Sequence, residues 1–137
     1  MRYHAEVKRE GRSWTAVFSD APGCATCASS RRAVLVAAQE ALEGWLEAHL
    51  VDGRAPPQPR VEPRGVPVAV DPQLAMAVQL RWARQASGLT QAELARRVGV
   101  SQQQVAKLER PGANPSIATL RKVADALGVR LELDLVA

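Results

Sequence analysis

Residues 89–110 read LTQAELARRVGVSQQQVAKLER and contain the clearest structural pattern in the chain. It contains two residue pairs of the same kind, since Thr90 stands three residues before Glu93 and Ser101 stands three residues before Gln104. Each pair predicts a capping box, in which two side chains satisfy backbone amides that the first turn of a helix leaves without partners. The stretch therefore predicts two successive helix starts.

Gly99 separates the two predicted helices, which we place at about 91–98 and 102–109. Glycine commonly ends a helix because it adopts the left-handed conformation without a steric penalty. One apolar face is available to hold the two helices together, formed by Leu94, Ala95, Val98, Val105 and Leu108. Two short helices joined by a glycine-containing turn form a helix-turn-helix, whose second helix can enter the major groove of DNA. The sequence thus predicts a DNA-binding motif.

The net charge of +4 is unevenly distributed along the chain. Residues 1–71 carry nine Lys and Arg against nine Asp and Glu, whereas residues 72–137 carry nine against five. Between Arg81 and Lys122 the balance is eight basic residues against two acidic ones. A basic surface on one small domain attracts the phosphates of nucleic acid. This distribution favours a nucleic-acid partner for the C-terminal half.

Further elements are predicted on both sides of the motif. We expect a long helix from Pro72 to Ser87 and another between Ser116 and Gly128. Residues Val129–Val136 then alternate apolar and polar side chains, a pattern typical of a half-buried strand. A single strand cannot satisfy its own backbone, so we expect it to pair with another part of the chain or with a second subunit.

The N-terminal half shows a different pattern, dominated by strands. Alternating side chains predict a hairpin from Tyr3–Lys8 and Ser13–Phe18, and a short third strand is expected at Cys24–Ala28. A helix is predicted over Ser30–Leu50 and one more strand over Val66–Val70. The apolar stripe of the helix consists of Val34, Ala37, Ala38, Ala41, Leu42 and Trp45.

Residues 52–65 are rich in proline and are predicted to contain no regular structure. Composition alone would put a domain boundary there, but the strand at Val66–Val70 needs a partner, and the N-terminal sheet is the nearest one. We therefore place the boundary near Asp71. The chain is predicted to be an α+β protein with two small domains: 1–71, a small antiparallel sheet with one helix, and 72–137, an all-α helix-turn-helix domain with a terminal strand.

Three glutamines, Gln102, Gln103 and Gln104, begin the second helix of the motif. A glutamine amide can donate and accept at once, which matches N6 and N7 of adenine and gives about 1–3 kcal/mol of discrimination per good contact. Gln104 has two competing roles, because a capping box with Ser101 would use the same amide. These side chains are the candidates for reading DNA sequence.

The motif resembles the phage-repressor type of DNA-binding domain, often called the XRE family. The resemblance implies that Gln102, Gln103 and Lys107 face base edges in the major groove. It also implies that Gln91, at the start of the preceding helix, contacts a DNA phosphate together with the helix N-terminus. Further candidates for contacts with the DNA backbone are Ser101, Arg110 and Asn114.

The segment Phe18–Cys24, FSDAPGC, resembles a run typical of the HicB antitoxin family, from which Ser19 and Ala21 depart. The resemblance continues through residues 40–46 and 52–53 and covers nearly the whole chain. It implies a partial RNase H-like domain that binds and blocks a small HicA-type RNase toxin, and a second half that represses the operon. We expect a homodimer or higher homo-oligomer on a palindromic operator, because two-fold proteins match two-fold half-sites.

Enzymatic activity is not expected, and no catalytic residue, metal site or cofactor is predicted. Two-metal hydrolysis needs several converging carboxylates, whereas Glu6, Glu10 and Asp20 are scattered along the chain. Cys24 and Cys27 form a Cys-x-x-Cys pair, but a closed zinc site needs four ligands. We therefore interpret both cysteines as packing thiols.

The chain contains no apolar run long enough to cross a bilayer and does not begin with a secretory signal, so a cytoplasmic location is expected. An alternative function is a helix-turn-helix regulator whose N-terminal domain senses a small ligand. The adjacent reading frame discriminates between the two. A short basic protein with one prominent histidine favours the antitoxin, whereas a metabolic gene favours the sensor.

Overall fold

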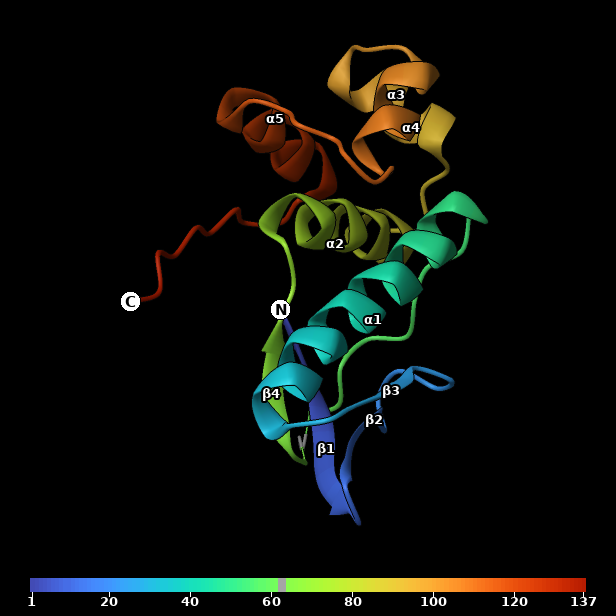
Figure 1. Ribbon diagram of the computed structural model, residues 1–137. Coiled ribbons are helices and arrows are strands. Elements are labelled where there is room, and N and C mark those ends of the chain that lie inside the picture. Colours follow the sequence, from blue (N-terminus) through green and yellow to red (C-terminus); the bar gives the residue numbers. More distant parts are fainter. Residues whose placement is uncertain (62–63) are drawn as a thin grey trace.

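The computed structural model describes residues 1–61 and 64–137 and shows an α+β fold (Figure 1). The N-terminal half contains, in chain order, β1 (Arg2–Glu10), β2 (Ser13–Phe18), β3 (Ala25–Ala28), α1 (Arg31–Val51) and β4 (Val66–Ala69). The C-terminal half contains α2 (Pro72–Ala86), α3 (Gln91–Val98), α4 (Gln102–Leu108) and α5 (Ile117–Leu127). The predicted fold class is confirmed.

The strands form one antiparallel sheet in the order β3-β2-β1-β4. β1 and β2 form the predicted hairpin, which turns at Gly11 with a φ of 63°. β4 pairs with the other edge of β1 and places Val68 opposite Tyr3. The prediction that the strand near residues 66–70 joins the N-terminal sheet is therefore confirmed.

Helix α1 covers one face of the sheet (Figure 1). Its N-cap is Ser30, whose Oγ accepts a hydrogen bond from the amide of Ala33 at 3.1 Å. Its buried residues follow a spacing of four and are Val34, Ala38, Leu42, Leu46 and Leu50. The predicted stripe is thus confirmed at three positions, whereas Ala37, Ala41 and Trp45 are only partly buried because they flank this line.

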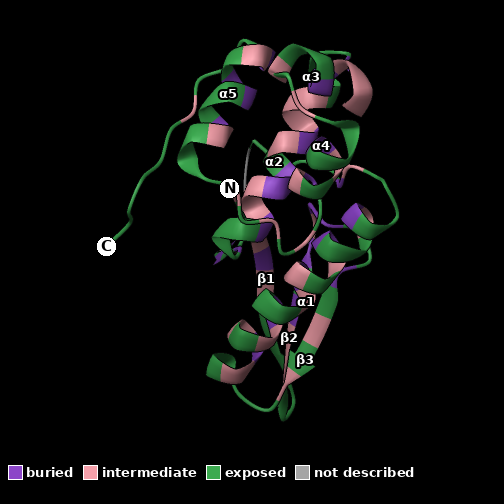
Figure 2. Ribbon diagram, turned by 90° about the horizontal axis from the view of Figure 1, so that it is seen from above, coloured by how far each residue is buried: buried purple, intermediate pink, exposed green. Residues whose placement is uncertain are grey.

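The first half of α2 belongs to the core of the N-terminal half. Its residues Leu74, Ala77 and Val78 are buried in one cluster with the inward side chains of the sheet and of α1. In Figure 2, the buried parts of α2 are purple. A second buried cluster is formed by Leu89, Leu94, Ala95, Val105, Val123 and Leu127, and the later α2 residues Leu80 and Ala83 pack against it. Helix α2 therefore contacts both cores.

The described part of the Pro-rich stretch 52–65 contains no helix or strand, as predicted, and residues 62–63 lie outside the described residues. The stretch is nevertheless anchored to the body of the protein. Trp82 on α2 donates from Nε1 to the carbonyl of Pro56 at 2.7 Å. This segment therefore packs between the two halves as part of the fold.

The prediction that Val129–Val136 form a strand is wrong for the single chain. Residues 129–137, all of them described, form neither strand nor helix. This C-terminal tail first runs back beside α5, and its end then projects away from the body of the protein (Figure 1). A strand forms only where a neighbouring strand satisfies its amides and carbonyls. The tail pairs with none of the described strands of its own chain. Pairing with a second subunit stays a prediction.

Candidate nucleic-acid interface

Both predicted capping boxes are present. At α3, the amide of Glu93 donates to Thr90 Oγ1 at 3.1 Å and the amide of Thr90 donates to Glu93 Oε1 at 3.3 Å. At α4, the amide of Gln104 donates to Ser101 Oγ at 3.2 Å and the amide of Ser101 donates to Gln104 Oε1 at 2.9 Å. Gly99 ends α3 with a φ of 83°. Local sequence alone therefore defines this pair of helices.

The two motif helices pack through the predicted apolar face. Leu94, Ala95 and Val105 are buried, and Val98 and Leu108 are partly buried against them. Val123 and Leu127 of α5 complete this core. Burying one side of α4 in this way leaves its opposite side free to face a ligand.

The candidate DNA-reading side chains lie on that open side. Gln102, Gln103 and Lys107 are all exposed on α4. Gln103 and Lys107 are four residues apart and therefore share one face of the helix. The candidates for contacts with the DNA backbone, Ser101, Arg110 and Asn114, are also exposed.

Gln104 is used by the cap. Its Oε1 accepts from the Ser101 amide and lies 3.3 Å from Ser101 Oγ, so the acceptor that an adenine contact would need is engaged. Only its Nε2 remains to donate. Of the two competing roles, the capping role is the one that the structure displays.

Gln91 begins α3 and is partly buried. Its Nε2 lies 3.5 Å from Glu109 Oε1, which orients the amide and uses one of its two protons. The second proton remains for an acceptor such as a phosphate oxygen. The candidate phosphate contact is thus geometrically linked to the end of α4, a connection that the sequence did not indicate.

A buried charge cluster lies behind this surface. Glu109, directly after α4, is 1% exposed and pairs with Arg81 Nε at 3.0 Å and with Arg84 Nε at 2.7 Å. Burial by itself raises the pKa of Glu109, but the hydrogen bonds and charges of the two arginines lower it further than burial raises it. The hydrogen bond with Glu109 raises the pKa of Arg84.

Arg81 and Arg84 therefore do not contribute exposed charge for DNA, although both belong to the excess of basic residues between 81 and 122. The sequence contained one indication that Arg81 is buried. Arg81 continues the buried line of Leu74 and Val78 on α2 at spacings of four and three. The basic residues that remain exposed between 81 and 122 are Arg96, Arg97, Lys107, Arg110, Arg121 and Lys122. The surface of the C-terminal half thus stays basic.

Comparison with known proteins agrees with this geometry. Residues 80–133 match the family described as helix-turn-helix. An uncharacterized HTH-type transcriptional regulator from Methanothermobacter thermautotrophicus is 43% identical over 53 residues, which cover 39% of this chain and 77% of that protein. The chain belongs to the helix-turn-helix family. Its domain at 80–133 is of the XRE type, as the motif predicted.

The similarity of this helix-turn-helix protein to known sequences also extends into the N-terminal half. The protein named Antitoxin HicB 2 from Photorhabdus laumondii is 29% identical over 133 residues, 97% of this chain and 95% of that protein. An uncharacterized HTH-type transcriptional regulator, y4dJ of Sinorhizobium fredii, is 50% identical over 46 residues, 34% of this chain and 60% of its own. The first match supports the predicted resemblance to the HicB family, and the second concerns the DNA-binding half.

The two cysteines of the Cys-x-x-Cys pair lie in different environments. Cys24 is buried, and this burial raises the pKa of its thiol, so it packs as predicted. Cys27 is exposed on β3, so its interpretation as a packing thiol is wrong. Within residues 1–61 and 64–137, no group of three or more His, Cys, Asp and Glu side chains is placed to hold a metal ion. None of the described helices is long and apolar enough to span a membrane.

Proposed function

We propose that this protein is an antitoxin that binds and neutralises a HicA-type mRNA-cleaving toxin and represses its own operon. The observation that carries the proposal is the match with Antitoxin HicB 2, which runs through both halves in the same order. The exposed face of α4 and the basic surface around it support operator binding. We assign toxin binding to residues 1–71 and DNA binding to residues 72–137.

Coexpression of the full chain with the toxin gene from the adjacent reading frame tests the antitoxin role. Growth should be restored by the wild-type chain. It should also be restored by the double variant Gln102→Ala/Gln103→Ala, because those side chains belong to the DNA-binding half. Repression of a reporter behind the operon promoter should be lost in the double variant alone.

The test requires full chains because α2 contributes Leu74, Ala77 and Val78 to the N-terminal core, so a fragment ending at residue 71 would lack part of that core. Loss of rescue by the double variant, in spite of a native fold, would contradict the division between halves. An adjacent frame without toxicity, together with a metabolite that changes operator affinity, would establish the ligand-sensing regulator instead.

Within the DNA-binding half, we propose that Gln102, Gln103 and Lys107 contact base edges and that Gln91 contacts a phosphate. The further backbone contacts are assigned to Ser101, Arg110 and Asn114. Gln104 contributes chiefly through the cap, because its acceptor is occupied by Ser101.

Variants of Gln102 and Gln91 should therefore differ in kind. Gln102→Ala should reduce discrimination between operator and scrambled duplex by about 1–3 kcal/mol, because a base contact is lost. Gln91→Ala should weaken binding to both duplexes alike, because every sequence offers the same phosphate. Titration of each variant with both duplexes at one salt concentration measures this. Equal loss of discrimination in the two variants would contradict the assignment.

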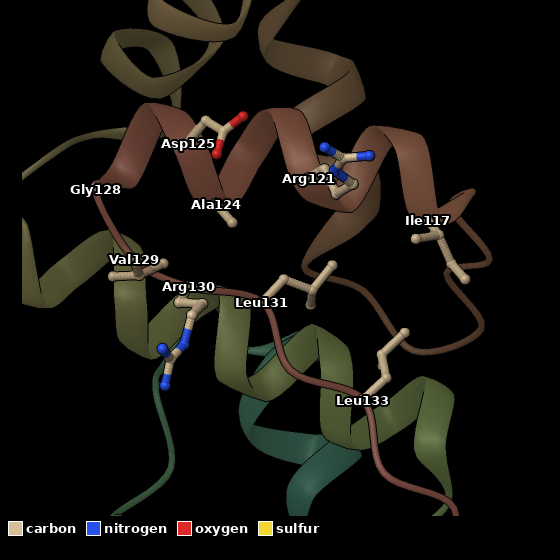
Figure 3. A pocket seen from close by; sticks show the side chains of 9 residues that line it. All are labelled: Ile117, Arg121, Ala124, Asp125, Gly128, Val129, Arg130, Leu131 and Leu133. Atoms are coloured by element: carbon tan, nitrogen blue, oxygen red, sulfur yellow. The ribbon is translucent and has the colours of Figure 1, made fainter.

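We further propose that the protein binds DNA as a homodimer that pairs the C-terminal tails of two copies. A groove of about 650 Å³ separates the tail from α5, and in Figure 3 Leu131 and Leu133 of the tail face Ala124 and Ile117 of α5 across it. Ile117, Val129, Leu133, Leu135 and Val136 are exposed in the single chain. A second copy would cover these apolar side chains and satisfy the backbone of the tail.

A further inference from the structure

The buried cluster at the end of the recognition helix contains more positive than negative charge. Arg81 and Arg84, both on α2, converge on the single carboxylate of Glu109. Arg81 itself is only 4% exposed. A buried guanidinium without enough acceptors is strongly destabilising, so the remaining donors of Arg81 need partners from elsewhere in the protein.

Arg81 Nη2 donates to the backbone carbonyl of Glu109 at 3.5 Å, and the N-terminal half supplies the partners of Nη1. Arg81 Nη1 donates to the carbonyl of Leu50 at 3.3 Å and to the carbonyl of Arg54 at 3.1 Å. Leu50 lies in the last turn of α1, where the helix dipole is negative, and its carbonyl also accepts from the amide of Gly53 at 3.1 Å. Arg81 therefore joins the last turn of α1 to the residue that follows the recognition helix.

The chain that follows α1 reinforces this junction. We call residues 50–57 the strap, since they run from the end of α1 along α2. Trp82 donates to the Pro56 carbonyl at 2.7 Å, and Tyr3 of β1 donates through Oη to the Pro57 carbonyl at 2.5 Å. The strap is thus hydrogen-bonded to the sheet on one side and to the first helix of the DNA-binding half on the other.

Arg84 differs from Arg81 in where its hydrogen-bond acceptors lie. Its donors go to both carboxylate oxygens of Glu109, at 2.7 and 2.8 Å, and to the carbonyl of Leu89 at 2.8 Å. All these acceptors lie within the DNA-binding half. The two arginines share one carboxylate, but only Arg81 crosses between the halves.

We propose that Arg81 is a positioning residue that fixes the recognition helix relative to the N-terminal half. The end of α1, the strap and Glu109 then move as one unit, and the two halves form a rigid body. A partner that displaces the last turn of α1 would alter the site of Glu109 and, through it, α4 and Gln91. This consequence rests on the proposed function, whereas the rigid junction itself does not.

Backbone ¹⁵N relaxation of the full chain tests the junction without toxin or DNA. In the wild-type protein, the sheet and helices α3 to α5 should report the same rotational correlation time. In Arg81→Met/Trp82→Phe, both cross-boundary sets of hydrogen bonds are removed, and the orientation of α3 to α5 relative to the sheet should change, which residual dipolar couplings measure. Fully independent tumbling is not expected, because Leu74, Ala77 and Val78 keep α2 in the N-terminal core. In the control Arg84→Met, which loses only hydrogen bonds to Glu109 and Leu89, the dipolar couplings should still report the wild-type orientation of the sheet relative to α3 to α5.

Independent tumbling in the wild-type protein would overturn the proposal whatever the variants do. So would a common correlation time with unchanged residual dipolar couplings in the folded double variant. If the double variant does not fold, the single variant Trp82→Phe should already change the dipolar couplings between the halves. A normal operator affinity and toxin rescue alongside independent tumbling would refute the junction and leave the proposed function intact.

Discussion

Glu109→Gln is expected to lower the free energy of unfolding by about 3–5 kcal/mol, the usual cost of removing one charge from a buried ion pair. The side chain is 1% exposed and accepts from Arg81 and from both Nε and Nη2 of Arg84. An amide of the same shape leaves two buried guanidiniums without a counter-charge and turns one acceptor into a donor. Urea denaturation followed by circular dichroism measures the change.

Asp52→Asn is the matched control for that variant. Asp52 pairs with Arg54 at 3.1 Å, but both side chains are more than half exposed. An exposed pair contributes about 0–1 kcal/mol, because water and salt screen it. Equal losses in the two amide variants would show that the buried cluster does not stabilise the fold.

The stability difference between the wild-type protein and Glu109→Gln should depend on pH. Because the pKa of Glu109 is lowered on folding, its charge stabilises the protein above the unfolded pKa of about 4.3, and this contribution is lost as the pH falls through the folded value. The wild-type protein should therefore lose more stability than Glu109→Gln between neutral pH and acid. Parallel pH profiles for the two proteins would contradict this assignment.

The parts of the fold that the sequence predicted are those that depend on neighbouring residues. Thr90 with Glu93 and Ser101 with Gln104 are three residues apart, so each cap can be recognised without knowing anything else about the fold. The alternation in β1 and β2 works in the same way, because side chains of a strand alternate between its faces. The strand near 66–70 was also placed correctly, since an apolar run after prolines needed the nearest available sheet edge.

The parts that the sequence did not reveal depend on distant residues. In the sequence, Arg81 looks like any other basic residue. Its burial depends on hydrogen bonds to the carbonyls of Leu50 and Arg54, which lie about thirty residues earlier. Glu109 acquires its role only when α2 and α4 are brought together. Such contacts leave no local pattern, apart from the position of Arg81 on the buried line of its helix.

The tail illustrates the opposite problem, because its pattern is clear but its partner is absent from the single chain. Residues Val129–Val136 have the alternation of a strand, and the chain offers them no strand to pair with among the described residues. Leu133 and Leu135 are consequently exposed. Leu131 alone among the apolar side chains of the tail is partly buried. The proposed pairing of two tails is therefore the part of the proposal that most needs a test.

Removal of the tail after Gly128 should convert the dimer to a monomer and reduce operator affinity at least about 100-fold. The reason is that two linked helix-turn-helix units bind two half-sites with a high effective concentration, which a monomer lacks. Light scattering measures the oligomeric state, and titration of the full operator and of a single half-site measures affinity. The affinity for a single half-site should remain nearly unchanged.

Two substitutions at Leu133 separate the contributions of the backbone and the side chain. Leu133→Ala removes apolar surface but keeps the amide, so it should weaken the dimer partly. Leu133→Pro removes the amide as well, and proline is poorly tolerated inside a paired strand, so it should approach the effect of the truncation if that amide donates across the tails. A truncated chain that stays dimeric would place the interface elsewhere. Equal effects of alanine and proline would show that the groove beside α5, and not strand pairing, holds the two copies together.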